Sequence, residues 1–327
     1  MRIMVYSFRP LDEKAYFDEM CAKEGFEYVT CADYPSVENA HLCRGCDAIS
    51  TIVCDVNREL LTALAAQGVR YICTRSIGRE HIDMQAAREL GLRVASAVYS
   101  PESVANYAIM LMLMACRRFP HVLERAKLQD FSLAGKRGRE LSQMTVGVIG
   151  LGRIGRTVLR HLSGFGCRLL GYDPAEGMEE DGLCERVPLH EIYRRCDMIS
   201  LHCPLTQENR HMIDAKALKK MKRGVMIVNT ARGGLIDTMA LVDALEGGHV
   251  AAAALDVIEN EYGLYYINHT GEAMANRELA LLSSFPNVIV APHAAFYTDV
   301  SISDMVRCTV DACAAFERGE SYIYEVK

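Results

Sequence analysis

The stretch VGVIGLGRIGR, residues 146–156, places Gly150, Gly152 and Gly155 at the spacing GxGxxG, between an apolar run and a helical pattern. Glycines at these positions allow a tight turn, a close approach of the backbone to a phosphate, and a helix N-terminus that faces a pyrophosphate. The spacing alone is a weak signal, because a glycine turn can also occur in an α/β protein that binds nothing. It predicts a strand, a turn and a helix with a candidate dinucleotide site.

The next apolar run, CRLLGY, ends in Asp173, eighteen residues after Gly155. A carboxylate at this position accepts hydrogen bonds from both ribose hydroxyls of NAD and repels the 2′-phosphate of NADP. The pattern therefore predicts NAD as the cofactor. Another adenosine cofactor on the same fold, such as S-adenosylmethionine, is an alternative at this point.

Apolar runs continue through the second half of the chain. They look like strands, with helical stretches between the first five, and they cover 144–150, 167–173, 197–203, 224–230, 251–257 and 287–293. The runs lack polar-apolar alternation, as expected for parallel strands that helices cover on both faces. We expect a large, doubly wound parallel-sheet domain.

The first hundred residues alternate apolar runs with helical patterns in the same way, which predicts a smaller α/β domain. This domain ends near Ser100, because Pro101 disfavours a helical residue before it and suits the first turn of a helix, here 102–118. The last helical pattern, after Thr298, is too short to form a domain. We expect it to return to the first domain, so that 1–100 and 299–327 form the substrate domain and 101–298 the NAD-binding domain.

Composition narrows the functional classes. Half of the 327 residues are hydrophobic, and the net charge of −6 is spread without a long charged block, which argues against nucleic acid and membrane partners. The most apolar stretch, 104–116, is shorter than the roughly 20 residues that span a bilayer, and the N-terminus does not resemble a secretory signal. A soluble, cytoplasmic protein is expected.

The thirteen cysteines are an odd number, scattered along the chain, which predicts reduced thiols rather than a disulfide framework. Cys43 and Cys46 have a metal or redox spacing. No second pair stands at zinc spacing nearby, so we predict no metal site.

Three polar residues follow predicted strands of the larger sheet: Arg232, Glu261 and His293. Parallel strands hold ligands at their carboxyl ends, so the three residues should face one crevice. A histidine can deliver a proton to a carbonyl oxygen, a carboxylate can orient the imidazole, and a guanidinium binds a carboxylate or keto oxygen in a forked geometry. Taken one at a time, each could be an ordinary surface or core residue. Beside a nicotinamide site, they predict reduction of a 2-oxo acid.

The motifs GLGRIG, YDP, HCPLT, NTARGGLID, LDVIENE and APHAAFYT, in this order and spacing, resemble the D-isomer-specific 2-hydroxyacid dehydrogenases across nearly the whole chain. TRSIGREHID, VYSPESVANY and LSQMTVGVIG are closest to the D-lactate dehydrogenases, including the type found in vancomycin resistance. The resemblance implies a Rossmann NAD-binding domain and a discontinuous, flavodoxin-like substrate domain. It also implies a homodimer, with the helix 102–118 contributing to the interface, and closure of the domains over the substrate on hinges near residues 100 and 298.

The resemblance assigns roles residue by residue. Arg232 would anchor the substrate, His293 would act as acid and base, and Glu261 would be its partner. The backbone of Ile77 and Gly78 would bind the substrate carboxylate beside Tyr99, and Phe296 would border the substrate side chain. Asp256 would lie by the nicotinamide amide and His202 along the cofactor. The expected cofactor-binding set comprises Gly150, Gly152, Arg153, Ile154, Gly155, Asp173, His202, Cys203, Pro204, Thr230, Ala231 and Asp256.

Three features bear on the substrate and on reactivity. Cys203 stands where the family usually has an apolar residue, which predicts sensitivity to thiol reagents that NADH blocks. Thr51 stands where some lactate enzymes carry a tyrosine, which leaves room for a branched or aromatic 2-oxo acid. The tyrosine-rich segment 262–278 resembles the lactate-type insertion and argues against glycerate, phosphoglycerate and formate enzymes.

The sequence thus predicts an NADH-dependent reductase of 2-oxo acids to D-2-hydroxy acids, with pyruvate to D-lactate as the first expectation and larger 2-oxo acids as the alternative. A nonenzymatic NADH sensor, similar to corepressors of this fold, is the competing class. The complete Arg232, Glu261 and His293 set disfavours it.

Overall fold

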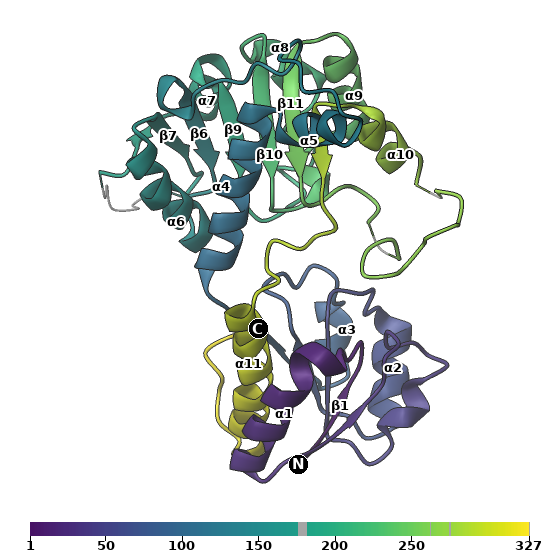
Figure 1. The fold of residues 1–327 in the computed structure, drawn as a ribbon. Helices are drawn as coiled ribbons and strands as arrows, with labels where there is room; N and C mark the ends of the chain where they lie inside the picture. The colour runs from purple at the N-terminus through teal and green to yellow at the C-terminus, as the bar shows by residue number, and fades with distance from the viewer. Residues whose placement is uncertain (176–181, 262, 275, 327) are drawn as a thin grey trace. The chain divides into compact units, whose positions relative to one another are not determined.

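A computed structural model describes residues 1–175, 182–261, 263–274 and 276–326. The chain divides into two compact units, one formed by Met1–Ser100 with Tyr297–Lys327 and the other by Pro101–Phe296 (Figure 1). Each unit is built on one sheet with helices on both faces, which confirms the predicted fold class.

The first unit has the strand order β13-β5-β4-β3-β1-β2. Its core is the flavodoxin-like order 2-1-3-4-5 in parallel register, and β13 alone runs antiparallel, against β5. The strands are β1 (Arg2–Val5), β2 (Glu27–Thr30), β3 (Ala48–Thr51), β4 (Tyr71–Thr74), β5 (Arg93–Ser96) and β13 (Glu325–Val326).

Two layers of helices cover this sheet. Helices α2 (Arg58–Ala66) and α3 (Met84–Glu89) bury leucines and alanines on one face, and α1 (Pro10–Glu24) and α11 (Asp299–Glu317) pack on the other. The C-terminal helix α11 therefore belongs to the N-terminal unit, because its apolar side chains complete that core.

The second unit is a seven-stranded, fully parallel sheet in the order β12-β11-β10-β9-β6-β7-β8. The order reverses between β6 and β9, which is the switch point where doubly wound sheets hold ligands. The strands are β6 (Thr145–Ile149), β7 (Arg168–Tyr172), β8 (Glu185–Arg186), β9 (Met198–Leu201), β10 (Val225–Asn229), β11 (Val250–Leu255) and β12 (Val288–Val290).

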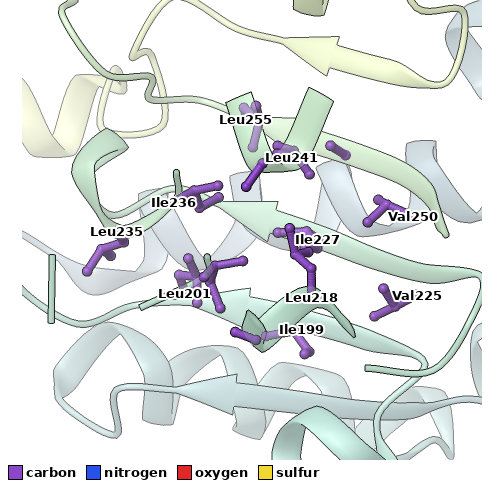
Figure 2. Packing of buried hydrophobic residues seen from close by; sticks show 14 of the residues in the cluster. Ile199, Leu201, Leu218, Val225, Ile227, Leu235, Ile236, Leu241, Val250 and Leu255 are labelled. Carbon is purple, nitrogen blue, oxygen red and sulfur yellow. The ribbon is translucent and has the colours of Figure 1, made fainter. Parts of the chain in front are cut away.

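Helices α4 (Pro101–Arg117) and α6 (Arg153–Leu162) pack on one face of this sheet, and α7 (Leu189–Arg195), α8 (Ala215–Lys220), α9 (Thr238–Glu246) and α10 (Arg277–Ser284) on the other. Figure 2 shows the second face, where Ile199 and Leu201 of β9 and Ile227 of β10 meet Leu218 and Leu241 from the helices. Both faces are apolar, which is why these strands show no alternation in the sequence.

Local chemistry sets the helix starts. Pro101 opens α4 as predicted. At the start of α2, α3, α8, α9, α10 and α11, the side chain of the preceding residue accepts a hydrogen bond from a backbone N–H of the first turn. These capping residues are Asn57, Asp83, Asp214, Asp237, Asn276 and Thr298. Such caps satisfy amides that the helix itself leaves unpaired.

Some elements were missed. β2 is a partly exposed edge strand, and β8 and β13 have two residues each, too few to show a pattern. α5 (Phe119–Lys127) follows Arg118, whose left-handed backbone (φ 51°) separates it from α4, and α10 follows a long polar segment. In each case the local pattern is too short or too polar for periodicity to reveal.

Candidate active site

The glycine loop after β6 is packed against the loop after β9. Gly150 has a left-handed backbone (φ +94°), and a Cβ there would lie 2.6 Å from the backbone nitrogen of Cys203. A Cβ on Gly155 would overlap the carbonyl oxygen of Gly150, so the helix α6 can approach the strand only without a side chain. A Cβ on Gly152, the N-cap of α6, would meet no atom within 4 Å. Two of the glycines are thus needed by the fold itself, and the third leaves the N-terminus of a ten-residue helix accessible, as a pyrophosphate requires.

Asp173 directly follows β7 and is turned toward this loop. Its carboxylate accepts the backbone N–H of Leu151 at 2.7 Å and that of Ala175 at 2.9 Å. These bonds fix the carboxylate at the strand end where the sequence places the ribose contact. Ile154, on the first turn of α6, packs on the apolar layer beneath, and Arg153 opens the helix.

The segment after β9 brings His202, Cys203 and Pro204 to the same edge of the sheet. His202 Nε2 lies 2.8 Å from the hydroxyl of Ser200, whereas its buried Nδ1 has no hydrogen-bond partner among the described residues. Burial lowers the pKa of His202 to about 4, so the imidazole is neutral. Burial also raises the pKa of the Cys203 thiol to about 11. The thiol is therefore protonated at neutral pH.

The strand β10 ends in a turn that carries Arg232. Asn229 is fully buried and bridges this turn, because its amide donates to the carbonyl of Arg232 and accepts from the N–H of Ala231. Arg232 Nη1 donates to the carbonyl of Ala231 at 2.7 Å. Thr230 presents a buried hydroxyl that has no hydrogen-bond partner within the described chain.

Gly233 ties the Arg232 turn to the loop after β11. A Cβ on Gly233 would overlap the carbonyl group of Ile258, so the two backbones touch. The N–H of Ile258 in turn donates to Glu261 Oε2 at 3.1 Å. The glycine after Arg232 therefore serves close packing between two strand ends, a need that only glycine meets.

Glu261 and His293 form a direct pair. Glu261 Oε1 lies 2.7 Å from His293 Nδ1, and both side chains are mostly buried. This contact leaves Nε2 as the ring nitrogen that can face a substrate, and it fixes the orientation of the imidazole. The ring of Phe296 stands edge-on to the imidazole, with centroids 6.3 Å apart. The ends of β10, β11 and β12, which are neighbours in the sheet, thus carry Arg232, Glu261 and His293 at one edge.

Asp256, at the end of β11, holds the His293 turn. It is fully buried, and its two carboxylate oxygens accept the N–H groups of Ala294 and Ala295 at 2.9 Å each, while its carbonyl accepts the N–H of His293. Burial raises the pKa of Asp256. Both oxygens are used inside the protein, so the structure gives this residue a positioning task besides the nicotinamide contact expected from the sequence.

In the other unit, Ile77 and Gly78 follow β4, at the carboxyl edge of that sheet, and the Ile77 side chain is exposed. Tyr99 lies after β5, near the end of that unit's first segment. Thr51 is fully buried at the end of β3, and its hydroxyl donates to the carbonyl of Ile52. Within this segment Ser76 is buried, Ile77 is exposed and Gly78 is half-buried.

Sequence reasoning missed two residues next to these segments. Arg75, fully buried, pairs with Glu13 at 3.1 Å and donates to Ser50 and to the carbonyl of Tyr6, which fixes the start of the 76–78 segment. A charged residue directly after an apolar strand was the available signal. Tyr266 donates from its hydroxyl to the carbonyl of His293 across 27 positions, and no local pattern predicts such a contact.

The residues fit a dinucleotide. The glycine loop leaves a helix N-terminus free of a side chain, and Asp173 is held at the ribose position. At the same sheet edge, buried polar atoms of His202 and Thr230 have no hydrogen-bond partner among the residues that the structure describes. Such atoms cost free energy unless a ligand or water satisfies them.

The other features considered in the sequence give less support for a functional site. Cys43 and Cys46 are buried in the first unit, where the Tyr6 hydroxyl lies 3.1 Å from Cys43 Sγ. Across the described ranges, no group of three or more His, Cys, Asp or Glu is arranged to hold a metal ion. No helix in the described part of the chain is long and apolar enough to span a bilayer.

A known protein family and several known proteins are similar to this chain in sequence. Residues 109–295 match the family model of the D-isomer specific 2-hydroxyacid dehydrogenase, NAD binding domain. An aromatic 2-oxoacid reductase of Clostridium sporogenes is 42% identical over 320 residues, 97% of this chain and 96% of that protein. A D-specific alpha-keto acid dehydrogenase of Enterococcus faecalis is 42% identical over 288 residues, 88% of each chain.

A solved structure of a related dehydrogenase also has this fold. The apo-structure of D-lactate dehydrogenase from Escherichia coli matches with a TM-score of 0.88 at 36% identity, and the match covers all of both chains. The chain belongs to the D-isomer specific 2-hydroxyacid dehydrogenases, and it is an NAD-dependent oxidoreductase of that family.

Proposed function

We propose that the protein reduces a 2-oxo acid to the D-2-hydroxy acid with NADH, with pyruvate to D-lactate as the first candidate reaction. The observation that supports it most is the 2.7 Å contact between Glu261 and His293 at the strand ends beside the Arg232 turn. When bound, the nicotinamide supplies the hydride for C2 of the substrate. His293 donates the proton to the substrate oxygen from Nε2, and Glu261 orients the imidazole through its contact with Nδ1.

The other groups bind and orient the substrate. Arg232 holds the carboxylate and keto oxygens in a forked geometry that a lysine does not offer. The backbone N–H groups of Ile77 and Gly78 bind the carboxylate, Tyr99 lies beside them, and Phe296 borders the side chain at C3. In this proposal 1–100 with 299–327 is the substrate domain and 101–298 the NAD-binding domain. Closure on hinges near residues 100 and 298 excludes water.

Reduction of larger, aromatic or branched 2-oxo acids is the second candidate. Thr51 is small and its hydroxyl is used inside its own turn, so no bulky side chain extends from this strand end. The relative from Clostridium sporogenes, named an aromatic 2-oxoacid reductase, supports the same reading.

Steady-state oxidation of NADH with pyruvate, 2-oxoisocaproate, phenylpyruvate and oxaloacetate, repeated with NADPH, tests both candidates. The highest kcat/KM for pyruvate supports a D-lactate dehydrogenase, and the highest for the larger acids supports the second candidate. Chiral analysis of the product must show the D-isomer. Tight NADH binding without turnover of any acid would contradict the proposal and favour a sensor.

We also propose that the protein is a cytoplasmic homodimer. Eight of the seventeen residues of α4 are buried within its own unit and are not available for an interface. Phe119, Leu123, Leu128, Phe131 and Leu133, on α5 and the segment after it, are exposed apolar side chains and support a protein interface there. Thirteen free cysteines support a reducing compartment. Sedimentation of the protein against a Phe131→Ser and Leu133→Ser variant tests the dimer.

A further inference from the structure

Tyr266 holds the backbone of the catalytic histidine. Its hydroxyl donates to the carbonyl oxygen of His293 at 2.8 Å. Both residues have a left-handed backbone, with φ of 67° for Tyr266 and 53° for His293. A non-glycine residue remains in this region only where its surroundings hold it there. On the N-terminal side of the same residue, the N–H of His293 donates to the carbonyl of Asp256. The turn is therefore fixed from both sides, by Asp256 and by Tyr266.

The ring of Tyr266 belongs to a group of three rings. Its centroid lies 6.4 Å from that of His293 and 6.3 Å from that of Phe296, and the ring stands edge-on to Phe296. Phe296 is itself 6.3 Å from His293. Tyr266 is 46% exposed, so it is not buried in the core. Its ring therefore offers apolar surface next to the imidazole.

We propose that Tyr266 is a positioning and specificity-determining residue: its hydroxyl fixes the His293 turn, and its ring forms with Phe296 an aromatic wall that receives the substrate side chain beyond C3. The proposal rests on the proposed reduction of 2-oxo acids, and it names the class that the wall favours. An aromatic side chain gains edge-on or stacked contacts with such rings, whereas the methyl group of pyruvate gains little.

The neighbouring residue provides a matched control. Tyr265 is 9% exposed, packs in the apolar core of the second unit, and its hydroxyl has no hydrogen-bond partner among the described residues. Tyr265→Phe removes the same atom from the same segment without touching the His293 carbonyl. Tyr266→Phe removes the bond and keeps the wall, and Tyr266→Leu removes both.

The experiment measures kcat and KM for pyruvate and phenylpyruvate, together with the Kd of NADH, for the wild type and the three variants. Loss of one neutral hydrogen bond in Tyr266→Phe should lower kcat about fivefold for both acids, with KM and NADH binding unchanged. Tyr266→Leu should lower kcat/KM for phenylpyruvate by about a further fivefold relative to pyruvate. Tyr265→Phe should match the wild type.

Every other outcome contradicts a specific part of the proposal. Wild-type kcat in Tyr266→Phe overturns the positioning role, and an equal effect of Tyr266→Leu on both acids overturns the wall. A wild type that reduces pyruvate but not phenylpyruvate also overturns the wall, while the proposed function stands. Failure to turn over any 2-oxo acid despite NADH binding contradicts the proposed function, and Tyr266 then has no reaction to position.

Discussion

His293 Nδ1 and Glu261 Oε1 lie 2.7 Å apart, and the second oxygen of Glu261 accepts the N–H of Ile258. The carboxylate therefore joins the imidazole to the loop that Gly233 packs against. A Glu261→Gln variant keeps the shape but places a neutral amide beside His293 in place of the carboxylate. We expect kcat to fall on the order of 100-fold with NADH binding retained. The exposed Glu272, mutated in the same way, should leave kcat unchanged, and a fully active Glu261→Gln enzyme would contradict the pair's role.

Substitutions of Arg232 test its proposed forked contact with the carboxylate and keto oxygens of the substrate. Arg232→Lys keeps the charge but replaces two parallel donors with a single ammonium. We expect kcat/KM for the 2-oxo acid to fall by about 100-fold or more, because substrate and transition state both lose the second bond. Arg232→Ala should be worse still. Isothermal titration should show unchanged NADH binding, and undiminished activity of Arg232→Ala would remove the substrate assignment.

Two glycines of the loop should differ in what they support: Gly152 supports cofactor binding, and Gly155 also supports the stability of the fold. A Cβ on Gly152 meets no protein atom, so Gly152→Ala should keep its melting temperature and bind NADH at least about tenfold more weakly, because the methyl group stands at the helix N-terminus. A Cβ on Gly155 overlaps the Gly150 carbonyl, so Gly155→Ala should lose stability as well. Equal stability of the two variants would contradict this division.

The buried His202 should make the folded protein less stable in acid. Its pKa is about 4 in the folded protein and 6.5 as a free side chain, so the unfolded chain binds a proton first as the pH falls. The free energy of unfolding should therefore decrease between about pH 6.5 and pH 4, by up to about 3 kcal/mol. Urea unfolding at pH 7, 6 and 5 should show this slope, and a His202→Gln variant should lose it. The exposed His190, replaced likewise, should retain it.

Cys203 changes the expectation for thiol reagents. With a pKa of about 11, little thiolate exists at neutral pH, so inactivation by iodoacetamide should be slow at pH 7 and accelerate about tenfold for each pH unit up to pH 10. NADH should protect the enzyme. A Cys203→Val enzyme that is inactivated at the same rate would assign the sensitivity to another cysteine.

The sequence predicted what depends on local rules. The glycine spacing, Asp173 and the strand-end positions of Arg232, Glu261 and His293 follow from a motif and from parallel topology, so the structure places each beside a strand end. The roles of these residues are still predictions. Contacts between distant segments could not be read in this way: the bond from Tyr266 to His293 and the bonds from Asp256 to Ala294 and Ala295 depend on how two loops pack.

Edge elements were equally hard to predict. β2 has four residues with partly exposed sides, and β8 has two, so neither carries a hydrophobic period. Of the tyrosine-rich segment, Tyr262 and Ala275 lie outside the described residues. The segment's similarity to the lactate-type insertion therefore remains an interpretation of its sequence.

The return of α11 to the N-terminal unit has a consequence for biosynthesis. Val306, Val310 and Phe316 fill the core against Ile3 and Val5, yet they are translated about 300 residues later. At roughly 5 to 20 residues per second, the nascent segment 1–100 waits on the order of 10 to 40 s for α11, and until then α1 alone covers that face of the sheet. During that interval the ribosome-bound chain is a substrate for chaperones, and any premature stop before residue 299 releases a protein in which the part of the face that α11 covers stays exposed.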